Sequence, residues 1–88
     1  MPELSRFYGI IIQMYFEPMG HRVPHFHARF GNSRASFRID PIEKLAGELP
    51  IRQRRLIEAW AELHQDELKA NWNAIQSEQP RIPIDPLR

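Results

Sequence analysis

Apolar and polar side chains alternate strictly over residues 24–40, on either side of the dipeptide Gly31-Asn32. This dipeptide suits a two-residue turn, because the first central position of such a turn needs a positive φ. We therefore predict a β-hairpin in which His25 pairs with Arg38 at the open end. One face of this hairpin is apolar and available to cover a core: Phe26, Ala28, Phe30, Ala35, Phe37 and Ile39. The other face is polar and carries His25, His27, Arg29, Arg34, Ser36 and Arg38.

Residues 7–16 are rich in β-branched and aromatic side chains, and apolar residues recur there at every second position. We predict one strand over Phe7–Phe16, followed by a loop over Glu17–Val23. Two interpretations fit Pro41–Leu49. The order of residues at Asp40–Glu43 is typical of a helix start, whereas Gly47 would soon end such a helix and an irregular edge strand fits equally well.

The segment Ile51–Ser77 contains no glycine or proline and consists mainly of good helix formers. A single helix of this length would span roughly 40 Å, against a radius of gyration of about 12 Å expected for a domain of this size. We therefore predict two helices that meet near His64, because the acidic pair Asp66-Glu67 favours the first turn of a second helix. The tail from Gln79 holds three prolines and predicts an extended strap.

These elements together predict an α+β fold in a single domain over residues 1–88. The expected architecture is a three-stranded antiparallel sheet with two helices packed on one face and an extended C-terminal strap. The sequence has no cysteine, which excludes disulfides, thiolate zinc sites and a cysteine nucleophile. No stretch approaches membrane-spanning length, so we expect a cytoplasmic protein without a membrane partner.

The polar face of the predicted hairpin concentrates positive charge, although the net charge of the chain is only +1 and any contact with nucleic acid must be local. Arg29 would face Arg34 directly, and opposed like charges destabilise a strand pair. Ser36 and Arg38 add hydrogen-bond donors, and arginine suits bidentate recognition of phosphate. These four residues therefore predict a site for RNA or another phosphate ligand. The alternative is that the arginines extend into water or meet nearby carboxylates.

His25 and His27 are alternate residues of the predicted strand, so their rings project from the same face about 7 Å apart at the backbone. Two imidazoles at this spacing can meet one divalent transition metal ion such as zinc or nickel. His21, in the preceding loop, is one candidate for the third ligand. Further candidates for the third or fourth ligand are His64, Asp40 and Glu67.

The same two histidines, His25 and His27, could instead act as a general acid and a general base. With Arg38 and Arg29 stabilising a pentavalent phosphate, they would be sufficient for metal-independent RNA cleavage. A histidine can also be purely structural when its ring nitrogens bond a carboxylate and a backbone carbonyl, as we expect for His64. The function hypotheses therefore include a small ribonuclease, a metal-binding enzyme and a purely structural interaction module.

Several motifs recur in matching order in a known family. They are Met1–Ile10, His21–His27 with its Pro-His-Phe-His core, Gly47–Pro50, Trp60 with His64, Glu67-Leu68 and Asn71-Trp72. Over nearly the whole chain these motifs resemble the small bacterial family catalogued as domain of unknown function 4160. The resemblance implies no settled activity. Genes of that family often lie beside genes for domain of unknown function 2442, and such two-gene modules resemble toxin–antitoxin pairs. The resemblance therefore implies a member of a toxin–antitoxin-like module that binds a small protein of the 2442 type.

Overall fold

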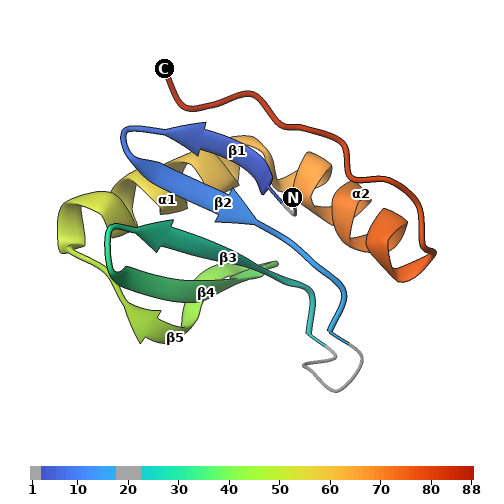
Figure 1. Cartoon of the computed structure of the whole chain (residues 1–88), viewed down its shortest axis with the longest axis horizontal. Coiled ribbons are helices and arrows are strands. Elements are labelled where there is room, and N and C mark those ends of the chain that lie inside the picture. The colour runs from blue at the N-terminus through green and yellow to red at the C-terminus, as the bar shows by residue number, and fades with distance from the viewer. Residues whose placement is uncertain (1–2, 18–22) are drawn as a thin grey trace.

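A computed structural model describes residues 3–17 and 23–88 (Figure 1). Over these residues the chain forms five strands followed by two helices. The strands are β1 (Glu3–Phe7), β2 (Ile10–Gln13), β3 (His25–Phe30), β4 (Ser33–Ile39) and β5 (Ile42–Glu48), and the helices are α1 (Ile51–Leu63) and α2 (Gln65–Gln76). The strands form one antiparallel sheet in sequence order. The fold is therefore α+β, but the prediction of a three-stranded sheet is wrong.

Strands β3 and β4 form the hairpin that the alternating pattern predicts. Their pairing runs from the turn to His25 opposite Arg38, which confirms the predicted register. Gly31 supplies the positive φ of 59° that the turn needs. The residues of the predicted apolar face are buried except Phe30, which is partly buried and packs against the core. The hairpin thus presents one face to the core and leaves the other for the site.

The prediction of one strand over Phe7–Phe16 is wrong, because the chain reverses direction inside that segment. Strands β1 and β2 are joined by a two-residue turn at Tyr8 and Gly9, whose φ values are 49° and 77°. Glycine adopts a positive φ without strain, but tyrosine is a strong strand former and hides the turn in the sequence pattern. The reversal adds one strand at the outer edge of the sheet, beside β2.

Residues 42–48 form the edge strand β5, so the edge-strand interpretation of this segment is correct. A two-residue connection at Asp40-Pro41 brings Ile42 opposite Ile39 in β4. Gly47 has a φ of 81°, and a Cβ atom there would lie 2.3 Å from the carbonyl oxygen of Arg34. Glycine is therefore required at this position for the close approach of β5 to β4.

Helices α1 and α2 are separated at His64, as predicted. Both helices contribute to the core that covers the apolar face of the sheet. Trp60 of α1 is fully buried, with its ring centroid 5.4 Å from that of Phe7 and 6.0 Å from that of Phe26. The indole Nε1–H donates a hydrogen bond of 2.8 Å to the carbonyl oxygen of Asp85, so the polar atom of this core side chain is satisfied.

Residues 79–88, for which we expect an extended strap, form no helix or strand and run from the end of α2 past β1 (Figure 1). The amide of Ile84 donates to the carbonyl oxygen of Leu4 in β1, and the Ile84 side chain is buried. The side chain of Asn71 in α2 bonds both the amide and the carbonyl of Ile82. These contacts tie the tail to the outer strand and to the second helix.

Candidate metal centre and basic pocket

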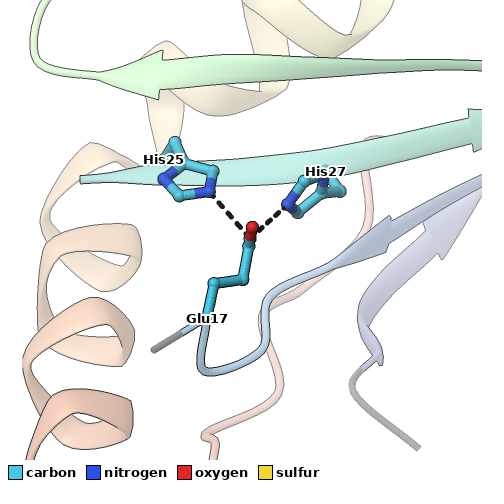
Figure 2. A group of neighbouring side chains, drawn as sticks. All are labelled: Glu17, His25 and His27. Atoms are coloured by element: carbon cyan, nitrogen blue, oxygen red, sulfur yellow. Dashed lines mark hydrogen bonds and ion pairs between the residues drawn. The ribbon is translucent and has the colours of Figure 1, made fainter. Parts of the chain in front are cut away.

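Three side chains meet at the open end of the hairpin, namely Glu17, His25 and His27 (Figure 2). Glu17 follows β2, and both histidines belong to β3. Oε1 of Glu17 lies 2.9 Å from Nε2 of His25 and 2.7 Å from Nε2 of His27. One nitrogen or oxygen from each of the three side chains lies within 4.8 Å of the others. We call these three residues the His–Glu cluster, and they could hold a metal ion.

The pairing of β2 with β3 explains why these side chains converge. His25 and His27 share one face of β3 because they are alternate residues. Gln13 in β2 is the cross-strand partner of His27, so the chain that leaves β2 passes His25. Glu17 is absent from the residues predicted for the site, because the sequence pattern assigns it to a loop. The signal that points to it is the continued alternation of Gln13, Tyr15 and Glu17 beyond the end of the strand.

A hydrogen bond to the backbone fixes one proton on His25. Nδ1 lies 2.8 Å from the carbonyl oxygen of Val23, which can only accept, so Nδ1–H is the donor. Nε2 of the neutral ring then carries a lone pair that points at Oε1 of Glu17, 2.9 Å away. Two lone pairs repel at this distance, so a cation must lie between these atoms, either a proton or a metal ion. An Nδ1–H bond to a backbone carbonyl is also how metal-ligating histidines are oriented.

Aromatic neighbours hold both rings of the cluster. The side chain of His25 is 1% exposed, and its ring centroid lies 5.2 Å from that of Trp72 in α2. The ring of His27 stacks on Tyr15, with centroids 4.7 Å apart and planes 8° from parallel. Rings packed in this way lose little further conformational freedom when they bind a ligand, so the cluster is preorganised.

Glu17 supplies a negative charge to the cluster. Partial burial raises its pKa, but the hydrogen bonds that His27 and His25 donate when a proton is the shared cation outweigh burial, and the pKa is lowered from its ordinary value of 4.5. Two imidazole nitrogens and a carboxylate oxygen are a suitable donor set for divalent transition metals. A tetrahedral ion holds its ligand atoms roughly 3.4 Å apart. The separations of 2.7 and 2.9 Å are hydrogen-bond lengths, so binding an ion would widen them by about 0.5 to 0.7 Å.

The other predicted metal ligands do not join the cluster within the described residues. His21 lies outside the residues that the structure describes. His64 instead pairs with Glu67, with Nδ1 2.6 Å from Oε1. Asp40 pairs with Lys69 at 2.9 Å. In residues 3–17 and 23–88, the third member of the histidine group is the unpredicted glutamate.

A pocket of about 360 Å³ lies beside the cluster, on the polar face of the sheet. The residues that line it include Tyr15, His27, Arg29, Arg34, Ser36 and Ala46. We call it the basic pocket, because it contains three of the four residues predicted to bind phosphate. The fourth, Arg38, does not line it and lies 3.4 Å from the carboxylate of Glu43. The pocket therefore brings Arg29, Arg34 and Ser36 together with one histidine of the cluster.

The fold and the site define a small α+β domain that combines a His/His/Glu group with a basic pocket on the open face of its sheet. None of its helices, over the described residues, is both long and apolar enough to cross a membrane. The chain belongs to the family described as domain of unknown function (DUF4160), whose model matches residues 9–73. The matched segment contains the His–Glu cluster and the lining of the basic pocket. Comparisons with curated proteins and with solved structures gave no match.

Proposed function

We propose that this domain binds a divalent transition metal ion through Glu17, His25 and His27. The observation that carries the proposal is the orientation of His25. Its Nδ1–H bond to the Val23 carbonyl directs the Nε2 lone pair at a carboxylate oxygen, and this arrangement requires a cation. The second histidine reaches the same oxygen from the same strand. Three ligands of this kind therefore point at one small volume.

The donor set restricts the kind of metal. Nitrogen and carboxylate ligands without thiolates suit zinc, nickel or iron better than calcium or magnesium, which prefer oxygen ligands alone. Two histidines and a glutamate also occur as the protein ligands of catalytic zinc sites, where the remaining position is open to water or substrate. A bound ion would supply Lewis acidity at the edge of the basic pocket. A metal-dependent ribonuclease or other hydrolase is the enzyme class that agrees with this chemistry.

Calorimetric titration of the chelator-treated chain with Zn²⁺ and then Ni²⁺ tests the proposal. Glu17→Gln and His27→Ala should each weaken the affinity for zinc at least tenfold, since even changes to the partners of metal ligands cost ten- to a hundredfold. His64→Ala is the matched control, because His64 pairs with Glu67 outside the cluster. At a concentration 100 times the dissociation constant, zinc should add about 2.7 kcal/mol to the free energy of unfolding.

The structural alternative predicts a different pattern. If Glu17 is only hydrogen-bonded to the two histidines of β3 and the cluster has a structural role, neither metal will bind. Glu17→Gln and His27→Ala will then lower the free energy of unfolding by about 1 to 3 kcal/mol through unsatisfied partners. Equal zinc affinity in the wild type and in both variants would also rule out the cluster as the metal site.

We also propose that the chain is one member of a toxin–antitoxin-like module and binds a small protein of the 2442 type in the cytoplasm. Membership of the DUF4160 family supports this proposal, through the gene arrangement that the family implies. The test is expression of the chain alone and together with the neighbouring gene product. Growth arrest that the second protein relieves, and co-purification of the two, are the expected results. Normal growth and separate elution would reject the proposal.

A further inference from the structure

The register of the sheet explains why the polar face is hollow beside the cluster. Side chains on this face form rows that cross the strands, and the row through the cluster contains small residues. From β2 to β5 this row consists of Gln13, His27, Ser36 and Ala46. The serine and alanine leave a low floor next to the imidazole, and the adjacent row places Arg29 and Arg34 at its side. The basic pocket is thus formed by the order of large and small residues across the strands.

Arg29 and Arg34 are cross-strand partners and both are exposed. Neither forms a salt bridge with another residue in the described part of the chain. Glu48 lies opposite Arg34 on β5, but its carboxylate lies 2.6 Å from the ammonium group of Lys44. Two opposed guanidinium groups with no counterion repel each other. This side of the pocket therefore favours an anion with several oxygen atoms.

His27 connects this pair of arginines to the His–Glu cluster. Its ring belongs to the cluster and also lines the pocket. Arg29 is the next residue of β3 on the same face, which places its Cα about 7 Å from that of His27. One extended arginine side chain covers such a distance. A single anion can therefore contact the guanidinium groups and an ion held by the cluster at the same time.

We propose that the basic pocket binds a phosphate ester about the size of one nucleotide, with the phosphate between the two arginines and the metal ion. This inference rests on the proposed metal site. Arginine forks and a transition metal ion both prefer phosphate oxygens, and the Ser36 hydroxyl at the pocket floor is a further donor. A volume of about 360 Å³ falls at the small end of ligand pockets, which run from about 300 to 1,000 Å³.

Adenosine monophosphate serves as the probe, with adenosine as the comparison that lacks the phosphate. Calorimetry should show that the zinc-loaded chain binds the monophosphate at least tenfold more tightly than it binds adenosine. The zinc-loaded chain should also bind the monophosphate more tightly than the zinc-free chain does. Arg29→Ala and Arg34→Ala should each weaken this binding about tenfold, since a charged hydrogen bond of this kind contributes about 1.4 kcal/mol or more. Both variants should bind zinc as the wild type does.

Arg55→Ala is the matched control, because Arg55 is an exposed arginine on α1 that does not line the pocket. It should leave both affinities unchanged. If zinc binds but the arginine variants keep full affinity for the monophosphate, the pocket assignment is wrong and the metal site stands. If zinc does not bind to the wild-type chain, the metal proposal fails and this inference fails with it.

Discussion

Substitution of Asn71 by alanine tests how the C-terminal tail is held. This side chain is 1% exposed and lies between α2 and the tail. Its Nδ2 donates to the carbonyl oxygens of Ile82 at 2.9 Å and Glu67 at 3.1 Å, and its Oδ1 accepts from the amide of Ile82 at 2.7 Å. One amide group therefore satisfies both backbone polar groups of a residue in a segment without secondary structure.

Asn71→Ala removes these three hydrogen bonds, each of which contributes about 1 kcal/mol to stability. Alanine is the better helix former by up to about 0.7 kcal/mol, which offsets part of the loss. We therefore expect the free energy of unfolding to fall by about 2 to 3 kcal/mol. Asn73→Ala is the matched control, because Asn73 is an exposed residue on the same helix. This substitution raises the helix propensity by the same amount but removes no hydrogen bond to the tail.

Urea denaturation of the two variants measures the difference, and amide hydrogen exchange locates it. Exchange should accelerate at Ile82 and Ile84 in Asn71→Ala, because the first amide loses its acceptor and the second depends on the same docking against Leu4. If Asn71→Ala is no less stable than Asn73→Ala, or if exchange at these amides is unchanged, the bonds to Asn71 do not hold the tail.

Two further predictions concern the sheet and the cluster. Gly47→Ala should destabilise the domain by about 2 to 3 kcal/mol in a urea titration, because its Cβ would lie 2.3 Å from the Arg34 carbonyl oxygen at a φ of 81°. If the free energy of unfolding falls no more than it does for a substitution at an exposed position, the close approach of β5 to β4 is contradicted. For Glu17, whose pKa is lowered from 4.5, the stabilising contribution is present above that pH and is lost as the pH falls through the folded-state value. In the presence of chelator, the free energies of unfolding of the wild type and of Glu17→Gln should therefore converge at acid pH. A difference that stays constant down to a pH at which the Glu17 carboxyl is fully protonated would refute this linkage.

The elements that local pattern determines could be predicted from the sequence. The hairpin register follows from the period of two and a turn dipeptide, since a slip of one residue would turn its apolar face to water. The break at His64 follows from the length of the helical segment and the acidic pair after it. The turn at Tyr8 and Gly9 could not be predicted in the same way. Its first residue has a positive φ that nothing in a tyrosine side chain signals, and the alternation continues on both sides of it.

The site depends on which residues of the polar face are buried and which are exposed, and the sequence pattern does not predict this. A strict alternation assigns His25 and Arg29 to the same exposed face, yet the structure buries the first and leaves the second exposed. The difference arises because the chain after β2 brings Glu17 over one end of the hairpin, while Trp72 of α2 contacts the same imidazole. The His25 ring is almost fully buried, so an uncompensated charge there is costly and its contact with the Glu17 carboxylate requires a shared proton or metal ion. Exposure at the other end lets two arginines remain opposed and available to a ligand. One strand thereby places the buried ring of His25 and the exposed side chain of Arg29 on a single face, four residues apart.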